Sequence, residues 1–211
     1  GHDLLKALSD MDYVTQQGLS GAIYALLAFD CRGYGIAADK NAVQTSREGL
    51  VKYILDKQLK DGGWAYSGDK AEPDMTAMAL QALAAYYKTD AKVKDAVDKA
   101  VTCLSKLQNT TGGYDSYGSV NSESAAQVIT ALTALGIDPD NDARFVKNGV
   151  SVLDSLCGFY VDGGFRHVSD GKLDPTATAQ GYYALAAYYR FADSQTALYD
   201  MTDLNTVEKA A

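Results

Sequence analysis

Proline, tryptophan, histidine and cysteine are all scarce in this sequence, and acidic residues outnumber basic ones. The 211 residues include three Pro, one Trp, two His and three Cys, and the net charge is −8. So few prolines favour long helices. The sequence has no basic stripe, which argues against a nucleic-acid partner and against docking on anionic lipid. The apolar run near the start, residues 19–29, is shorter than the ~20 residues of a membrane-spanning helix, so we expect no membrane span.

Cys31, Cys103 and Cys157 are an odd number of cysteines in a chain that is long enough to fold without them. A chain of this length buries roughly 70% of its unfolded surface and needs neither a disulfide nor a metal to fold. We expect the three thiols to be small buried side chains, and one disulfide plus a free thiol is the alternative. The acidic balance fits an extracellular or cell-surface setting, and we expect the chain to be part of a larger secreted or surface-attached bacterial protein.

A repeat of about 50 residues organises the chain, and double glycines followed by an aromatic residue reveal it. A glutamine, Gln58 or Gln108, precedes each of the first two glycine pairs, whereas the third copy begins with Cys157 instead. Such a period is typical of architectures that stack one supersecondary unit on the next. The three copies contain Gly62-Gly63-Trp64, Gly112-Gly113-Tyr114 and Gly163-Gly164-Phe165.

Each period is predicted to contain two helices of different character. The first starts at an acidic or proline-containing cap, and residues 75–87 and 176–189 carry no charge, which predicts helices buried on all sides. The second, predicted around residues 50–55, 97–104 and 145–153, carries charges on one face and ends before a double glycine. We therefore expect an inner and an outer layer with about seven substantial helices and no substantial sheet.

The closest likeness to a known repeat lies in the first clear copy. Gln58 and the glycine pair are followed by Glu72-Pro73-Asp74 and then by Thr-Ala-x-x-Leu at residues 76–80. This pattern resembles the repeat of terpenoid cyclases, squalene cyclase among them, and of protein prenyltransferases. The resemblance implies an all-α fold, the α/α toroid of helical hairpins. About four hairpins are fewer than a closed toroid requires, so we expect a partial, open barrel.

The expected organisation is a single repeat domain over residues 1–211. Clear repeats cover residues 46–192, a degenerate first copy covers residues 1–45, and a less regular tail covers residues 193–211. An open arc leaves apolar inner surface exposed, which favours self-association or a neighbouring protein domain as partner.

The resemblance offers one catalytic candidate, Asp74. It matches the acid that class II cyclases use to protonate a polyene, although Glu72 and Met75 replace two other acids of that motif. An isoprenoid cyclase or prenyltransferase-like enzyme that uses Asp74 as its acid is therefore one alternative. The other is structural: Asp74 and Glu123 lie in the first turn of a helix, where an acid complements the dipole and caps free N–H groups.

Complete catalytic or metal-binding sets are missing from the motifs that the resemblance would supply. The two histidines are His2 and His167, and neither has the nearby Cys of a zinc prenyltransferase site. None of the three cysteines lies in the Gly-Cys-Gly-Glu-Gln run of a thioester protein. We therefore expect a non-catalytic domain that requires no cofactor and holds no metal.

The remaining prediction is a cleft in which aromatic rings and acids bind a ligand. Because cobalamin carriers are among the proteins with the resembled fold, a corrinoid is the sharpest expectation for a small-molecule ligand, and tyrosines with acids also suit a sugar or a peptide. A purely structural interaction scaffold is the alternative. The aromatic residues after the glycine pairs occupy equivalent positions, so packing inside the hairpins is an alternative for those three. The candidate ligand-binding residues are Trp64, Tyr66, Asp74, Tyr114, Tyr117, Glu123, Phe165, His167, Asp174 and Tyr182.

Overall fold

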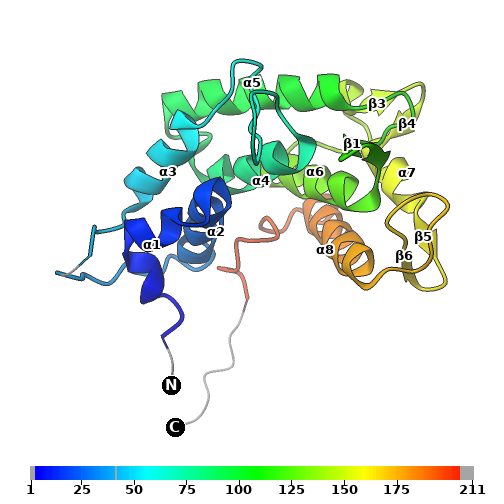
Figure 1. Ribbon diagram of the computed structural model, residues 1–211. Helices are drawn as coiled ribbons and strands as arrows, with labels where there is room; N and C mark the ends of the chain where they lie inside the picture. The colour runs from blue at the N-terminus through cyan, green and yellow to red at the C-terminus, as the bar shows by residue number, and fades with distance from the viewer. Residues whose placement is uncertain (1–2, 41, 205–211) are drawn as a thin grey trace, which may run out of the picture.

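The computed structural model describes residues 3–40 and 42–204, and in this part the chain is built mainly of helices (Figure 1). It contains eight α-helices, three 3₁₀ helices and three antiparallel hairpins whose strands are two residues long. The expectation of a mostly helical fold is therefore confirmed. The α-helices are α1 (Met11–Thr15), α2 (Gly18–Asp30), α3 (Arg47–Asp56), α4 (Pro73–Leu83), α5 (Ala91–Leu107), α6 (Ser122–Ala134), α7 (Val152–Cys157) and α8 (Pro175–Ala192).

The shorter elements lie mainly in the connections between these helices. The 3₁₀ helices are η1 (Ala7–Ser9), η2 (Ala84–Tyr86) and η3 (Ala143–Phe145). The strands pair in sequence order as β1 (Asp115–Ser116) with β2 (Ser119–Val120), β3 (Val146–Lys147) with β4 (Val150–Ser151), and β5 (Tyr160–Val161) with β6 (Gly164–Phe165).

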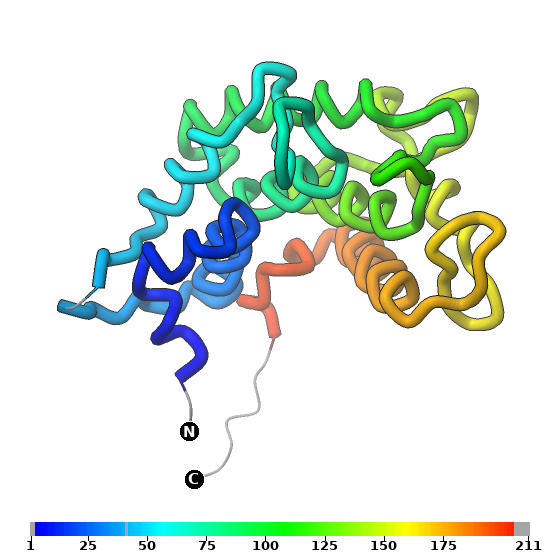
Figure 2. The backbone as a smooth tube through the Cα atoms, viewed as in Figure 1, coloured from blue at the N-terminus to red at the C-terminus, as the bar shows by residue number. Residues whose placement is uncertain are grey.

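Helices α2, α4, α6 and α8 form an inner row, because each contacts the next one in sequence order. Helices α3, α5 and α7 form an outer layer, and each packs against the inner helix that precedes it in the chain. Figure 2 shows the chain passing from one layer to the other and back. The inner helices begin after the glycine-containing loops, so the loops and the N-terminal ends of α4, α6 and α8 lie together.

Helix α5 illustrates how sequence places a helix in the outer layer. Val93, Val97, Val101 and Leu104 recur at helical spacing and are buried, which gives the helix one apolar face. Two Lys–Asp pairs spaced four residues apart lie on the solvent side. The Asp90 side chain accepts hydrogen bonds from the first free backbone N–H groups and so fixes the start of the helix.

Helix α4 illustrates the inner row. Ala77, Ala79 and Leu80 are fully inaccessible to solvent, as expected for a helix that contacts α2, α5 and α6. Small side chains let these neighbours approach closely, and the absence of charge after Asp74 removes the cost of burying charge.

The prediction of an outer helix through residues 145–153 is wrong over most of its length. Phe145 ends η3, and Asn148 and Gly149 both have positive φ in the turn between β3 and β4. An Asn-Gly pair strongly favours this type of hairpin turn, and it outweighs the helical spacing of the apolar residues. Helix α7 starts only at Val152, where Ser151 and the residue three positions later form a capping box.

The prediction that residues 176–189 are buried on all sides is also wrong. Helix α8 buries Ala177, Gly181 and its other small residues, but Tyr182 is 46% exposed and Tyr189 is 65% exposed. The cause is its position, because α8 is the last inner helix of the row in the described part of the chain and packs mainly on α6.

Candidate functional site

The glycine-containing loops are tied to the outer layer by glutamine side chains. The amide Nε2 of Gln58 donates to the carbonyl of Gly62 at 2.7 Å and to that of Ala96 in α5 at 2.8 Å. Gln108 repeats this arrangement with the carbonyls of Gly112 and Phe145, at 2.9 and 2.8 Å. Each amide therefore joins its own loop to the following outer element.

The second glycine of a pair is needed because the loop lies directly against an inner helix. A Cβ added to Gly63 would lie 2.6 Å from Thr76 Oγ1, and one added to Gly164 would lie 2.5 Å from Thr178 Oγ1. Thr76 Oγ1 accepts a hydrogen bond from the Trp64 N–H at 2.9 Å, and Thr178 serves Phe165 in the same way. The loops are thereby fixed to α4 and α8 by side-chain-to-backbone bonds.

Three of the candidate ligand-binding residues belong to the core. Trp64, Tyr114 and Phe165 are all 0% exposed, so they pack inside the hairpins and do not line an open cleft. The indole N–H of Trp64 donates to the Ile54 carbonyl at 2.7 Å. Their prediction as ligand contacts is corrected accordingly, and the packing alternative describes them.

Two further candidates have structural contacts. The Asp174 carboxylate accepts a hydrogen bond from the Ala177 N–H at 2.8 Å, which makes it the N-cap of α8. Tyr182 donates to the Gly163 carbonyl at 2.9 Å, and its ring edge packs against Phe165. Both residues hold the third loop against α8.

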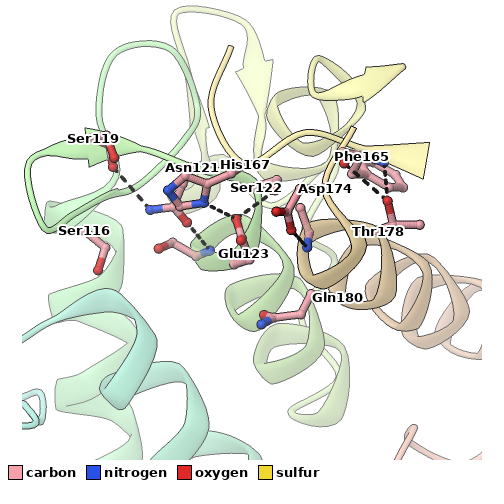
Figure 3. A network of polar contacts seen from close by, with 12 residues as sticks. Ser116, Ser119, Asn121, Ser122, Glu123, Phe165, His167, Asp174, Thr178 and Gln180 are labelled. Atoms are coloured by element: carbon pink, nitrogen blue, oxygen red, sulfur yellow. Dashed lines mark hydrogen bonds and ion pairs between the residues drawn. The ribbon is translucent and has the colours of Figure 1, made fainter. Parts of the chain in front are cut away.

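The other candidates lie around the starts of the inner helices, on a surface that we call the rim. Its members are Tyr66, Asp74, Ser116, Tyr117, Glu123 and His167. Ser116 donates to Asp74 Oδ2 at 2.9 Å, and this bond joins the β1–β2 hairpin to α4. His167 Nδ1 lies 2.8 Å from Glu123 Oε2, a contact that joins the third loop to α6 (Figure 3). The rim thus contains two polar pairs, each of which connects neighbouring repeats.

Asp74 and Glu123 do not cap the N–H groups of their helices, and that expectation is wrong. In α6 the cap is Asn121, whose side chain accepts from the Ser124 N–H at 2.9 Å (Figure 3). Glu72, at the start of α4, instead accepts from the Tyr66 N–H. Both acids remain in the first helical turn, where their charge still complements the helix dipole. One Asp74 oxygen, Oδ1, is buried with no hydrogen-bond partner among the described residues.

Tyr117 occupies an unusual backbone position on the rim. The three hairpins turn through Tyr117-Gly118, Asn148-Gly149 and Asp162-Gly163, and the first residue of each pair has φ near +50°. Asn and Asp tolerate this left-handed conformation, whereas a bulky aromatic residue rarely adopts it. The Tyr117 side chain is also 87% exposed, so burial within the chain does not compensate for the strain.

A row of polar side chains, the amide row, continues from the rim along the inner helices. Gln81 Nε2 donates to Gln127 Oε1 at 2.9 Å, and Gln127 Nε2 donates to Gln180 Oε1 at 3.2 Å. The Tyr183 hydroxyl lies 2.6 Å from Gln127 Nε2 and completes the row. Burial raises the pKa of Tyr183, and the nearby tyrosines Tyr199 and Tyr24 and the charge of Asp74 raise it further. This row was not predicted, although the one glutamine in each of three inner helices that carry a single charged residue was a usable signal.

The cysteines differ in their surroundings. All three are free thiols, and Cys103 is buried as expected, whereas Cys31 is partly exposed and Cys157 is exposed. The disulfide alternative and the expected burial of Cys31 and Cys157 are therefore wrong. Burial raises the pKa of the Cys103 thiol.

Of the two histidines, His2 lies outside the described residues, 3–40 and 42–204. No group of three or more His, Cys, Asp or Glu side chains there is arranged to hold a metal ion. None of the helices in the same ranges is long and apolar enough to cross a membrane.

The chain was compared with known proteins. It matches no family model, and a search of curated proteins likewise finds no match. The resemblance to terpenoid cyclase-like repeats therefore stays a prediction that rests on the sequence motifs.

Proposed function

We propose that this chain is a non-catalytic binding domain that takes a small polar ligand at the rim. The observation that carries the proposal is Tyr117, an aromatic side chain held in a strained turn and left almost wholly in solvent. Strain that brings no packing within the chain is a common feature of ligand-binding positions. Tyr66, on the preceding loop, is 73% exposed and adds a second ring to the same surface.

The polar groups of the rim define the chemistry of the ligand. Glu123 presents carboxylate oxygens, which accept hydrogen bonds from hydroxyl and amide groups, and Asp74, whose Oδ1 is buried, adds negative charge beside them. Tyrosine rings offer flat apolar faces with a polar tip, which suit extended ring systems and sugar rings. Because Ser116 and His167 already orient the two carboxylates, little conformational entropy is lost when a ligand binds.

A corrinoid is the first ligand that we propose, because it combines a broad flat ring with many amide donors. An oligosaccharide is the second candidate, favoured by the two exposed tyrosines that accompany the carboxylates. The enzyme alternative is weaker. An acid catalyst at Asp74 would have to donate a proton, whereas Asp74 accepts a hydrogen bond from Ser116 here.

We also propose that the two helical layers are part of an α/α toroid with an open, partial ring. The successive contacts of the four inner helices, each backed by an outer helix, support this arrangement. Small-angle scattering of the purified chain tests it, because a curved arc and a straight stack of the same mass give different distance distributions.

The biological setting is a further part of the proposal. We assign the domain to a secreted or cell-surface bacterial protein, in which a neighbouring domain or a second copy covers part of the inner row. The partly exposed phenol of Tyr24 on α2 and the exposed face of α8 support such a partner. Light scattering over a range of concentrations tests self-association.

Titration calorimetry with cyanocobalamin and with a panel of oligosaccharides tests the binding proposal. We expect one of these ligands to bind the unmodified chain, and we expect Tyr117→Asn to weaken binding by about tenfold or more. Tyr189→Gln is the matched control, because it removes an exposed tyrosine far from the rim residues in sequence, on the face of α8. Equal binding by Tyr117→Asn, or binding of neither class of ligand, would contradict the proposal. Turnover of squalene or a prenyl diphosphate that Asp74→Asn abolishes would establish the enzyme alternative instead.

A further inference from the structure

The opposite ends of the inner helices are covered by the C-terminal part of the described chain. Residues 194–204, which we call the strap, run from the end of α8 across the inner row toward α2 (Figure 1). The Met201 N–H donates to the Cys31 carbonyl, just after α2, at 2.8 Å. Ala197, Leu198 and Tyr199 are partly buried, and burial raises the pKa of Tyr199. Within the strap the Asp200 N–H donates to the Ala197 carbonyl at 2.9 Å, so it contacts the inner row as a turn-forming peptide would.

The strap fills its groove incompletely. A pocket of about 440 Å³ lies on one side of it and a pocket of about 450 Å³ lies on the other. The floor between them is formed by Ala84, Ala85 and Ala134, which line both pockets, and Ala197 of the strap separates the two. Without the strap the two pockets would form one continuous groove across the ends of α4 and α6.

One side chain of α8 holds the strap in place. Arg190 Nε donates to the Thr196 carbonyl at 2.9 Å, and its Nη2 donates to Thr196 Oγ1 at 2.6 Å and to Asp203 Oδ2 at 2.5 Å. The strap begins at Ser194, a residue other than glycine with φ of +55°. Its attachment thus depends on a few polar contacts that follow a strained helix end.

The groove is chemically suited to a peptide. The C-terminal ends of helices expose carbonyl oxygens, which accept hydrogen bonds from backbone N–H groups. The alanine floor leaves room for a side chain, and the carboxylate of Asp30 at its edge is already bonded to Arg47 and Tyr86. The bond from Met201 to the Cys31 carbonyl is an example of this recognition within the chain itself.

We propose that this groove is a binding site for a peptide that forms a turn through a small–aliphatic–tyrosine core, and that the strap occupies it as an internal competitor. The partner is a peptide segment of the same type as Ala197-Leu198-Tyr199. Its binding requires release of the strap, so the affinity of the intact chain equals that of the open groove multiplied by the fraction of molecules in which the strap is released. This site is separate from the rim, and its existence does not depend on the ligand proposed there.

The test uses the full chain and a fluorescent peptide with the sequence of residues 194–204, followed by anisotropy. In the double variant Thr196→Val/Asp203→Asn the strap loses the hydroxyl contact and the ion pair with Arg190 but keeps the bond to the Thr196 carbonyl, and the groove itself is unchanged. We expect this variant to bind the peptide several-fold more tightly than the unmodified chain does, by about fivefold at most. A peptide in which the position of Tyr199 is alanine is the matched probe, and we expect it to bind more weakly.

A second variant keeps the test decisive if the strap contacts prove necessary for folding. Ala85→Arg in the unmodified chain fills the groove at an exposed position and should release the strap, which faster hydrogen exchange in residues 196–204 would report. Added to the double variant, the same substitution should abolish peptide binding. Equal affinity of the double variant and the unmodified chain, or no difference between the two peptides, would overturn the proposal.

Discussion

The two ends of the inner helices are covered in different ways. At the N-terminal ends, each loop carries a buried aromatic residue, and glutamine or threonine side chains bond it to a neighbouring helix. At the C-terminal ends, the strap is held by Arg190 and by one backbone bond to Cys31, and it leaves a pocket on each side. The same helices therefore carry one preorganised surface, which suits a small ligand, and one removable cover, which suits exchange with a peptide.

Removal of a buried aromatic residue from the loops at the N-terminal ends should have the largest effect on the free energy of unfolding. Trp64→Ala empties a fully buried site and removes the bond to the Ile54 carbonyl, so we expect the free energy of unfolding to fall by about 3–5 kcal/mol. Urea denaturation measures the change, and Tyr189→Ala is the control at an exposed position. A loss of less than about 1 kcal/mol would mean that the loops do not depend on their aromatic residues.

A methyl group at the close approach of loop and helix should have the next largest effect. Gly63→Ala places a Cβ within 2.6 Å of Thr76 Oγ1, and we expect it to lower the free energy of unfolding by about 1–3 kcal/mol. Gly35→Ala is the matched control, because a Cβ there would meet nothing within 4 Å. Thermal melting of both variants separates the two cases, and equal melting temperatures would argue against tight packing of the loop.

Alkaline pH should destabilise the fold through the buried phenols of the inner row. Burial raises the pKa of Tyr183 above its ordinary value, so this group stays neutral in the folded chain while it ionises in the unfolded chain. The contribution of Tyr183 to the free energy of unfolding is complete below about pH 10 and decreases as the pH rises above that value. Urea midpoints at pH 8 and pH 10.5 should therefore differ less in Tyr183→Phe than in the unmodified chain. An equal difference between the two urea midpoints in both proteins would contradict the raised pKa of Tyr183.

Release of the strap should change dynamics more than stability. Thr196→Val/Asp203→Asn removes partly exposed polar contacts, so we expect a loss of about 1 kcal/mol or less. Hydrogen exchange should become faster in residues 196–204 and stay unchanged in the loops of the rim. Faster exchange at both ends would show that the two covers are coupled. That result would contradict the difference between the two ends described above.

The smallest effect on stability is expected at the hairpin turns. Tyr117→Asn places a residue that tolerates positive φ where a tyrosine now stands, so stability should stay equal or rise by a few tenths of a kcal/mol. The reciprocal change, Asn148→Tyr, should destabilise the β3–β4 hairpin. Thermal melting of both variants gives the comparison, and a clear loss of stability in Tyr117→Asn would mean that the tyrosine stabilises the fold.

Several loops and helices could be predicted from short patterns within the sequence. The glycine pairs located the loops, the uncharged stretches located the inner helices, and the spacing of Val93, Val97 and Val101 located an outer helix. The Asn148-Gly149 turn was also a local signal, and it was overlooked because apolar residues on both sides match a helical period. The Asn-Gly dipeptide is a stronger signal for a hairpin turn than the apolar spacing is for a helix.

Features that join distant parts of the chain were not predicted. The amide row joins residues about 50 positions apart, and nothing in the sequence near Gln81 or Gln127 specifies that pairing. The exposure of Tyr189 follows from which helices flank α8, and the path of the strap follows from contacts with the ends of α2 and α8. Half of the ten predicted site residues belong to the core, a cap or a loop contact, because the same residue types serve packing and recognition.

The glutamine bonds have a mechanical consequence. Gln58 and Gln108 each fasten a loop to the outer element that follows, so force applied to the ends of the chain passes through these amides from one repeat to the next. In the third repeat, Phe159 stands four residues before the glycine pair and supplies packing in place of an amide donor. Under tension we therefore expect the third repeat to unfold first. The order in which the repeats unfold follows from the residue that stands four positions before each glycine pair.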